Sequence, residues 1–354
     1  MQPAIPHTGG QATERGPRGG PWPSIYSRPV RRSRALRTVA WAVLGAGVAA
    51  PLARRRLRLH PAVVLGAAGA APIALCVVRP RTPARDVATC VLQMWAYIAG
   101  YEMPNDDPEG LRRRTRVDYP VAIDRVLGLG HPPTIRLQRW LASPGHIRRL
   151  DKPLVWAHWM WFFVPHSAMA YVLWRRRDLF PRGAAQMYAV FDLGLIAYWA
   201  LPTAPPWYAA ERGRLEPGPR ERQEAMRAYA QAPDAPAARR MMAEYGEQFW
   251  KQRWGPLYSL LGGNPLAAMP SLHFATSVMG AHLLSEAGPV EGAVGWAYAA
   301  TLGLALVYLG EHYLIDLIAG VALTEAVRRA TPRATPAAAA LSRAVQRLEA
   351  MART

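Results

Sequence analysis

Apolar residues along this chain are gathered into windows, and arginines occupy much of the sequence between the windows. Most windows approach the roughly 20 residues that a helix needs to cross a bilayer core of about 30 Å. They cover residues 35–53, 61–78, 86–102, 153–174, 184–203, 271–286, 292–310 and 312–330. This alternation predicts an all-α, polytopic transmembrane helical bundle. The window 61–78 is short and rich in Ala and Gly, so the pattern leaves open whether both of the first two windows span.

Two long polar stretches, 103–152 and 207–270, interrupt the windows and are predicted to lie on the outer side of the membrane, the second with amphipathic helices. The residues before the first window are rich in Gly, Pro and Arg, a composition typical of disorder. The chain is therefore predicted to contain a disordered basic tail, accessory membrane segments, a main membrane domain and a basic cytoplasmic tail. These parts cover 1–34, 35–84, 85–330 and 331–354, and residues 337–351 of the last part have helical spacing.

The formal net charge is +19, although 51% of the residues are hydrophobic. Most basic residues lie in tails and short segments beside apolar windows, where they act as topology signals and contact anionic lipid. No nucleic-acid motif accompanies the charge, so we expect the lipid bilayer as a partner and no nucleic acid. Cys76 and Cys90 are too few for a disulfide framework or a metal set. The pattern leaves the oligomeric state open.

The arginines also predict the orientation of the chain. Five of them lie at the end of the last window or beyond it: Arg328, Arg329, Arg333, Arg343 and Arg347. The C-terminus is therefore predicted to be cytoplasmic, and residues 271 and 312 then begin their windows at the outer face. Counting the windows backwards places segments 79–85 and 175–182 on the cytoplasmic side, and the arginines in both segments agree with that side. Segment 54–60 falls outside, so either one early window does not span or its arginines lie at the outer surface.

Two histidines and an aspartate form the candidate catalytic set. His273 follows Pro270 and Ser271, which are typical of a helix start. His312 begins the last window, and Asp316 stands four residues later, so the two are predicted to share one helical face. A carboxylate there fixes the imidazole tautomer and leaves the other ring nitrogen free to attack. His273 can protonate the leaving oxygen. This set is sufficient for metal-free phosphoryl transfer through a phosphohistidine.

The alternative for each histidine is packing, because a lone histidine at an aromatic helix end is more often a packing residue than a catalyst. Asp316 weighs against that alternative, since it stands between Leu and Ile residues in an apolar window, where an ionisable side chain is costly. A metal site is the rival chemical interpretation. Two imidazoles and one carboxylate, without a cysteine or a third ligand at metal spacing, disfavour it. We expect no metal and no cofactor.

At these residues the chain resembles the type 2 phosphatidic acid phosphatase superfamily. The segment 270–273, Pro-Ser-Leu-His, is similar to the Pro-Ser-Gly-His motif of that superfamily, and His312 with Asp316 is similar to the end of its third motif. More narrowly, the chain resembles the branch of inositol phosphorylceramide synthase and sphingomyelin synthase. Three stretches carry this closer resemblance: Ala204-Pro205-Pro206-Trp207-Tyr208, Met269-Pro270-Ser271-Leu272-His273 and Gly310-Glu311-His312-Tyr313-Leu314-Ile315-Asp316-Leu317.

The resemblance implies a core of six helices and an outward-facing site. His312 would form the phospho-enzyme, Asp316 would support it, and His273 would protonate the leaving group. The third motif of the superfamily begins Ser-Arg, but the matching positions here are Ala305 and Leu306. The first motif, with its Lys and Arg, is not evident. Both motifs supply cations for a phosphate dianion, so their loss favours a phosphodiester donor and a transferase, unless arginines of 103–152 substitute.

Several further residues are candidates for binding the substrate. Ser271 stands next to the predicted catalytic set. Trp207 and Tyr208 follow a rigid Pro-Pro exit that can shape a pocket wall, although an aromatic belt alone would explain them. His158 lies near the outer end of its window and either lines the site or packs in the core.

A polar cluster in the first long stretch is a candidate for binding phosphate or a polyol. It contains Arg116, Asp118 and Tyr119, with Asp124 nearby. The alternative is a solvated helix with surface ion pairs.

Three functions remain in view. The first is a membrane lipid phosphotransferase that moves a head-group phosphate, such as inositol phosphate, from a phospholipid to another acceptor. The second is a phosphatase of a lipid or polyprenyl phosphate, in which water resolves the same phosphohistidine. The third is a non-catalytic lipid transporter, which midplane charges or broken helices would favour. All three predict a multi-pass protein of the cell membrane.

Overall fold

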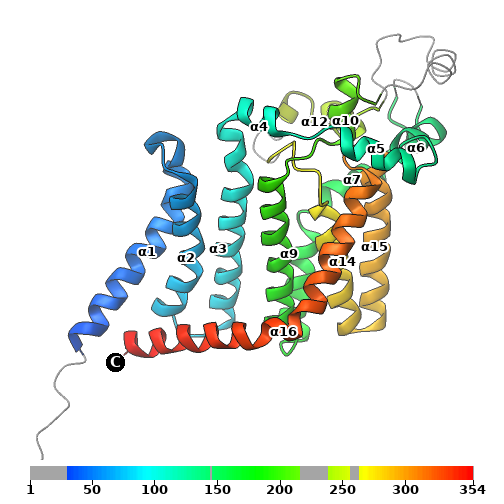
Figure 1. The fold of residues 1–354 in the computed structure, drawn as a ribbon. Coiled ribbons are helices and arrows are strands. Elements are labelled where there is room, and N and C mark those ends of the chain that lie inside the picture. Colours follow the sequence, from blue (N-terminus) through cyan, green and yellow to red (C-terminus); the bar gives the residue numbers. More distant parts are fainter. Residues whose placement is uncertain (1–29, 144–145, 216–237, 256–262, 354) are drawn as a thin grey trace, which may run out of the picture.

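The chain forms a bundle of long helices with a layer of short helices over one end (Figure 1). A computed structural model describes residues 30–143, 146–215, 238–255 and 263–353. The longer helices are α1 (Val30–Leu57), α2 (Pro61–Val78), α3 (Pro83–Glu102), α7 (Asp151–Met160), α8 (Val164–Arg175), α9 (Phe180–Ala200), α14 (Leu272–Ala287), α15 (Pro289–Tyr308) and α16 (Leu314–Arg353). Isolated bridges are the only β structure in these described ranges, which confirms the predicted all-α fold.

The predicted windows correspond to helices, with three corrections. Window 153–174 is split, because α7 ends at Met160 and α8 begins at Val164 with a proline in its first turn. The last window continues without a break to Arg353 as part of α16, and the tail is helical, as the spacing in 337–351 predicts. The basic N-terminal tail lies outside the described residues up to residue 29, and α1 already begins at Val30.

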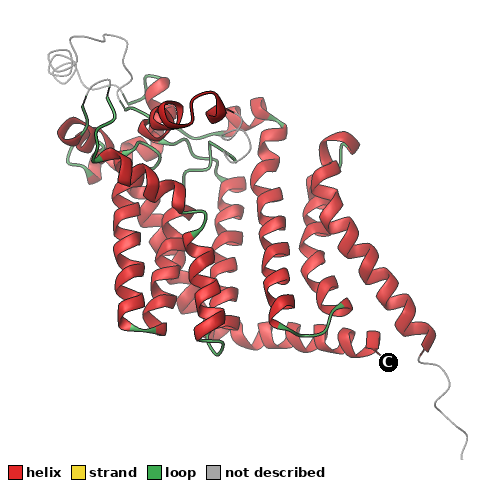
Figure 2. Cartoon of the chain, turned by 180° about the vertical axis from the view of Figure 1, so that it is seen from behind, coloured by secondary structure: helices red, strands yellow, loops and turns green. Residues whose placement is uncertain are grey.

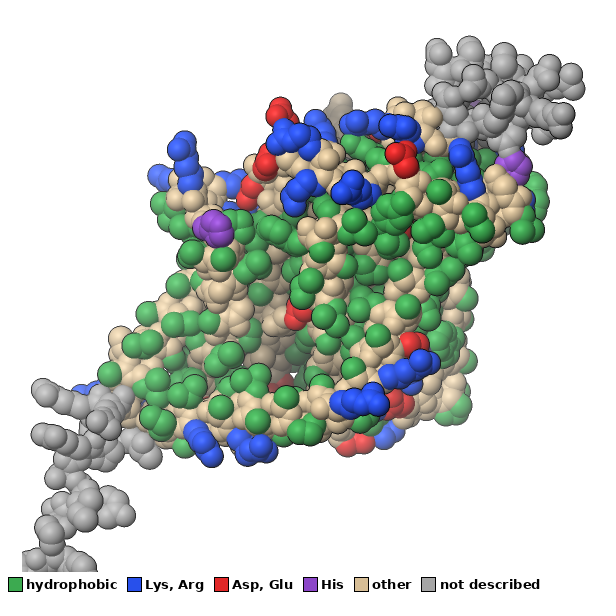
Figure 3. Space-filling model, in the orientation of Figure 1, with side chains coloured by type: hydrophobic (Ala, Val, Ile, Leu, Met, Phe, Trp, Pro, Cys, Tyr) green, Lys and Arg blue, Asp and Glu red, His purple; other side chains and the backbone are tan. Residues whose placement is uncertain are grey.

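Three described helices are long and apolar enough to cross a membrane: Ser33–Leu57, Pro61–Val78 and Pro289–Tyr308. In the space-filling view, hydrophobic side chains cover much of the middle of the bundle, and charged side chains gather toward its two ends (Figure 3). This banding is expected where the middle faces lipid and the ends face water. The fold is therefore that of an all-α membrane protein.

The two long polar stretches contribute a helical layer at one end of the bundle (Figure 2), and the helices predicted within 207–270 form part of it. The layer contains η1 (Met103–Asp106), α4 (Pro108–Arg114), α5 (Asp118–Leu127), α6 (Pro133–Leu141), α10 (Pro206–Glu211), α12 (Met241–Trp250) and η2 (Lys251–Arg253). Prolines stand in the first turns of α4, α6 and α10, where a missing backbone N–H costs least. This layer covers the end of the bundle at which α14 and α16 begin (Figure 1).

Close packing and one polar clasp hold α9 against its neighbours. A Cβ atom on Gly194 would lie 2.4 Å from the Leu272 side chain, so the glycine allows α9 to approach the start of α14. In the middle of α9, both carboxylate oxygens of Asp192 accept hydrogen bonds from Gln93 of α3, at 3.1 and 2.9 Å. The Asp192 carboxylate thus joins α9 to α3 near the middle of the helix.

The C-terminal half of α16 runs across the end of the bundle opposite the helical layer, below α3, α2 and α1 (Figure 1). Pro332 and Pro336 lie inside this helix. A largely buried ion pair joins Arg85 to Glu349 at 2.6 Å. Ala352 packs in one cluster with Ala40 of α1 and residues of α2. The accessory hairpin of α1 and α2 is therefore attached to the helix that carries Asp316.

Candidate active site

The start of α14 is fixed by several hydrogen bonds. Ser271 is its N-cap, and the Ser271 Oγ atom accepts a hydrogen bond from the Phe274 N–H at 3.3 Å. The hydroxyl of Tyr198 donates to the carbonyl of Pro270 at 2.8 Å and accepts from the Leu272 N–H at 3.2 Å. Ser271 was a candidate for binding substrate, but its side chain is fully buried and caps the helix. These contacts set the position of His273 in the first turn.

The start of α16 is built around Asp316. The Asp316 Oδ2 atom accepts a hydrogen bond from the Tyr313 N–H at 2.9 Å, so the carboxylate caps its own helix. The same oxygen lies 3.2 Å from Nδ1 of His312. His312 precedes the helix, which begins at Leu314, so the prediction that it shares a helical face with Asp316 is wrong. The cap, rather than the helical repeat, brings the two side chains together.

Asp124 of α5 supports this helix start from outside. Its Oδ2 and Oδ1 atoms accept hydrogen bonds from the N–H groups of Leu314 and Ile315, at 3.0 and 2.9 Å. Asp124 is 0% exposed. Burial raises the pKa of Asp124 to about 6, against the lowering effect of the two N–H groups. Asp124 therefore does not belong to the polar surface cluster of Arg116, Asp118 and Tyr119 with which its sequence position groups it.

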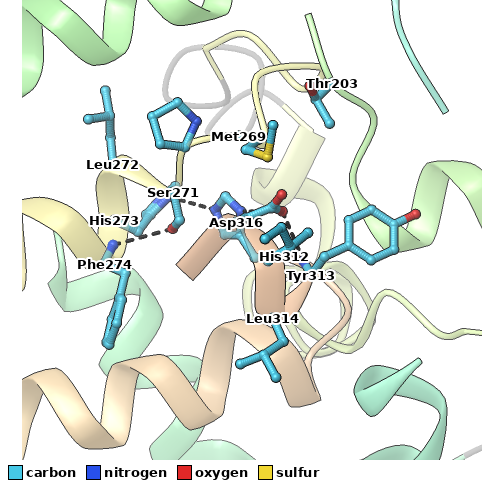
Figure 4. A network of polar contacts seen from close by, with 12 residues as sticks. Thr203, Met269, Ser271, Leu272, His273, Phe274, His312, Tyr313, Leu314 and Asp316 are labelled. Atoms are coloured by element: carbon cyan, nitrogen blue, oxygen red, sulfur yellow. Dashed lines mark hydrogen bonds and ion pairs between the residues drawn. The ribbon is translucent and has the colours of Figure 1, made fainter. Parts of the chain in front are cut away.

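The two histidines face each other. His273 Nδ1 lies 3.2 Å from His312 Nε2, and the close-up shows the two histidines together with Asp316 (Figure 4). His312 is 3% exposed and Asp316 is 0% exposed. The backbone ties the two helix starts as well, because the Ser271 N–H donates to the Asp316 carbonyl at 2.9 Å. The structure thus brings the whole predicted catalytic set together.

Aromatic rings enclose His273. Trp161, at the break between α7 and α8, has its ring centroid 4.1 Å from that of His273. The Trp161 Nε1–H donates to the hydroxyl of Thr276 at 2.9 Å, which fixes the indole. His158 stacks on His273 with centroids 5.0 Å apart, so it packs against the candidate catalytic set. Its Nδ1 atom is buried and has no partner in the described part of the chain. Sequence reasoning did not assign Trp161 a place here.

The side chains of the polar cluster in the first long stretch, Arg116, Asp118 and Tyr119, do not converge on one site. Arg116 is exposed, and its backbone pairs with residues 202–204. Asp118 is exposed and forms a loose ion pair with Arg214 at 3.7 Å. Tyr119 alone points inward, where its hydroxyl lies 2.7 Å from that of Thr203. Asp118 therefore fits the alternative of a surface ion pair.

Trp207 and Tyr208 lie at the start of α10, and their rings meet edge to face with centroids 5.7 Å apart. Trp207 is buried, and the guanidinium of Arg240 lies over its ring at 3.9 Å. Arg240 also forms an ion pair with Glu311 at 3.2 Å from its Nε atom. The indole is thus covered by a cation whose partner directly precedes His312. No sequence motif marked Arg240.

A buried amide clamps the chain around Arg240 onto the turn before His312. Gln138 of α6 donates to the carbonyls of Arg239 and Tyr308, both at 2.9 Å, and accepts from the Arg239 N–H at 2.8 Å. The Met241 N–H donates to the carbonyl of Leu309 at 3.2 Å. Gly310, with φ of 82°, permits the close turn, since a Cβ atom there would lie 2.5 Å from the Arg239 carbonyl oxygen.

Comparison with known proteins agrees with the resemblance of the motifs. Residues 121–328, more than half of the chain, match the family model described as PAP2 superfamily. The chain therefore belongs to the PAP2 superfamily, whose membership supports a phosphatase or phosphotransferase type of activity. The match includes the candidate catalytic residues but does not define the branch or the substrate. No curated protein and no solved structure matches the chain significantly.

Proposed function

From membership of the PAP2 superfamily, we propose that this chain is a membrane lipid phosphotransferase that moves a head-group phosphate through a phosphohistidine at His312, without a metal. One observation carries the proposal. Asp316, His312 and His273 form a continuous series of contacts, with 3.2 Å at each step. The closer branch resemblance, to inositol phosphorylceramide and sphingomyelin synthases, supports inositol phosphate as one candidate head group.

In the first step, His312 Nε2 attacks the phosphorus atom of the donor. The N–P bond forms as the bond from phosphorus to the lipid alcohol breaks, and the departing oxygen takes a proton from His273. The Nδ1–H of His312 remains hydrogen-bonded to the Asp316 carboxylate, whose negative charge balances the positive charge of the substituted ring. The phosphoryl group has to enter between the two rings, so substrate displaces the contact between His273 and His312.

In the second step, an acceptor hydroxyl gives its proton to His273 and attacks the phosphorus atom. The N–P bond breaks, His312 returns to its starting state, and the product is a new phosphate ester. A lipid or polyol acceptor makes the reaction a transfer, whereas water makes it a hydrolysis. The phosphatase alternative, acting on a lipid or polyprenyl phosphate, therefore differs only in this step.

The positions of two apolar side chains favour a diester donor. Ala305 and Leu306 stand where the superfamily's third motif has its Ser and Arg, and both are fully buried in apolar clusters. Neither side chain supplies a cation to the site. A phosphodiester carries one negative charge, and a phosphate monoester carries close to two, so a site with fewer cations suits the diester.

An apolar groove beside the site supports a lipid substrate. Its volume is about 650 Å³, and it lies between α14, α15, α16 and α6. Phe274, which follows His273, and Leu314, two residues after His312, line its wall. Ala300, Leu304 and other apolar residues or glycines complete the lining. We assign this groove to the hydrocarbon chain of the substrate, since burying such a chain is favourable by roughly 0.8 kcal/mol per methylene.

The orientation remains part of the proposal: a multi-pass protein of the cell membrane, with its site outside and its C-terminus in the cytoplasm. Supporting it, the starts of α14 and α16 lie at one end of the bundle and the basic half of α16 at the other (Figure 1). Arg54 and Arg55 pair with Asp106, and Arg54 also with Glu102. These pairs favour the alternative in which the arginines of 54–60 lie at the outer surface.

The test uses purified protein in detergent with phosphatidylinositol labelled in its head group, and with candidate lipid acceptors. Transfer predicts release of diacylglycerol and retention of the head group on a new lipid. His312→Ala should abolish turnover. The control is His282→Ala, which should retain turnover, because His282 lies further along α14 and pairs with Glu325 of α16. Full turnover by His312→Ala would refute the phosphohistidine. Release of free phosphate from monoesters alone, without transfer, would favour the phosphatase.

A further inference from the structure

The proposed phospho-enzyme requires a cation near His312, because the phosphoryl oxygens carry negative charge throughout the exchange at phosphorus. The third motif no longer provides one, since Ala305 and Leu306 are buried and apolar. The arginines of the first long stretch were the other candidates, but Arg116 is exposed on the outer layer. The contacts of the site indicate a different origin for the charge.

Arg240 is the residue directly before α12, and its side chain extends toward the turn before His312. Its side chain is 20% exposed, and that of its partner Glu311 is 10% exposed. Glu311 is bonded through the backbone to His312, so the ion pair places the guanidinium beside the turn that presents the proposed nucleophile. The cation thus lies beside the residue that directly precedes the proposed nucleophile.

The position of Arg240 is fixed rather than incidental. Gln138 holds the carbonyl and N–H of the preceding residue, and the following residue donates its N–H to Leu309. Trp207 provides a flat face under the guanidinium at 3.9 Å. A planar, weakly hydrated cation stacks well on indole and keeps the geometry with which it binds phosphate oxygens.

The neighbouring arginine has a different set of partners. Arg239 directs Nε and Nη2 to the carboxylate of Glu244 and Nη1 to the carbonyl of Ser143. These contacts join α12 to the segment after α6. Arg240 instead faces the residue that precedes His312.

We propose that Arg240 is the cation that binds the phosphoryl group of the substrate, and that Glu311 and Trp207 hold it in place until a phosphate oxygen replaces the Glu311 carboxylate. The inference rests on the proposed function and adds a binding residue for any phosphate ester, mono- or diester. It also gives Trp207 a role as the platform for that cation rather than as a direct substrate contact.

The experiment measures orthovanadate binding and lipid turnover with the full chain in detergent. Orthovanadate serves as the probe because it carries the oxygens and charge of a phosphoryl group. The variants are Arg240→Gln, Arg240→Lys and Glu311→Gln. Arg212→Gln is the matched control, because Arg212 also stacks on an aromatic ring of α10, that of Tyr208, but is exposed at the surface. Thermal unfolding without orthovanadate reports whether each variant folds.

Arg240→Gln should weaken orthovanadate binding and raise the KM for lipid about 10- to 100-fold, since hydrogen bonds to charged groups have that magnitude. Arg240→Lys should lie in between, because it keeps the charge and loses the planar fork. Glu311→Gln should bind orthovanadate as tightly as the wild type or more tightly, because it removes a competing anion. Arg212→Gln should match the wild type.

Equal losses in Arg240→Gln and Glu311→Gln would overturn the inference, since they would show an ion pair with only a structural role. Unchanged affinity in Arg240→Gln, or no binding by the wild type, would overturn it too. Turnover that needs His312 but not Arg240 removes this inference and leaves the proposed function. If orthovanadate binding needs Arg240 but the protein turns over no lipid phosphate, the inference about Arg240 is kept and the proposed function is refuted.

Discussion

Asp124 allows a quantitative test of how the proposed catalytic helix is held. Its carboxylate accepts hydrogen bonds from the Leu314 and Ile315 N–H groups at the start of α16 and is itself 0% exposed. Burial raises its pKa from 3.8 to about 6. The folded protein therefore holds this proton more tightly than the unfolded chain does. The resulting stabilisation is present at low pH and is lost as the pH rises through about 6.

The perturbation is Asp124→Asn, which keeps a capping oxygen and does not titrate. Asn and Asp are comparable as helix caps. A shift of about two pKa units corresponds to about 3 kcal/mol of unfolding free energy. We expect the melting temperature of the variant to rise relative to that of the wild type as the pH increases from 4 to 7.5. The relative change should be about 5–10 °C, taking 2–4 °C per kcal/mol for a chain of this size class.

The assay is thermal unfolding in detergent at a series of pH values, with both proteins in the same buffers. Two parallel curves would refute the reasoning, because they would mean that Asp124 does not titrate differently in the folded state. Asp124→Ala serves as the contrast. It leaves two N–H groups at the helix start without their acceptor, at about 1–3 kcal/mol each, and should lower stability at every pH.

Two further predictions concern the turn before His312 and the apolar groove. Gly310→Ala forces a side chain into a φ of 82° and to within 2.5 Å of a backbone oxygen, so turnover should fall at least about tenfold; Gly45→Ala, with nothing within 4 Å of the new Cβ, should retain it, and equal turnover in both would contradict the prediction. Ala300→Trp should raise the KM for long-chain lipids about tenfold, the equivalent of two buried methylenes, and spare short-chain substrates. Ala293→Trp, on the same helix outside the groove lining, is its control, and a KM that does not depend on chain length would exclude the groove as the chain site.

The sequence predicts the long helices well, because lipid-facing windows are continuous and bounded by charge. The sequence also predicts that His273, His312 and Asp316 lie close together, because each stands at a recognisable helix start. The extent of α16 is harder to predict from hydropathy. The segment 337–340 is all alanine, the best helix former, so the helix continues beyond the apolar window despite Pro332 and Pro336.

The support of the site was not predictable in the same way. Asp124 reaches Leu314 across 190 residues of sequence, and Gln138 reaches Tyr308 across 170. Arg240 stands in a polar stretch where no repeat or motif distinguishes it from other arginines. Contacts of this kind depend on how the outer layer folds over the bundle, and a single sequence carries no local pattern for them. The relation of Asp316 to His312 differs from the predicted shared helical face for a simpler reason, because two residues four apart can also meet across a helix cap.

The hydrogen bond from the Ser271 N–H to the Asp316 carbonyl is the first of several links between α14 and α16. Further along, the Thr324 hydroxyl of α16 donates to the Ala275 carbonyl at 2.9 Å, and His282 of α14 pairs with Glu325 of α16 at 2.9 Å. α14 has 16 residues and is about 24 Å long, so these links are spread over much of its length. The two helices are therefore expected to move as one body, which keeps the spacing of His273 and His312 nearly constant when the surrounding bilayer changes thickness.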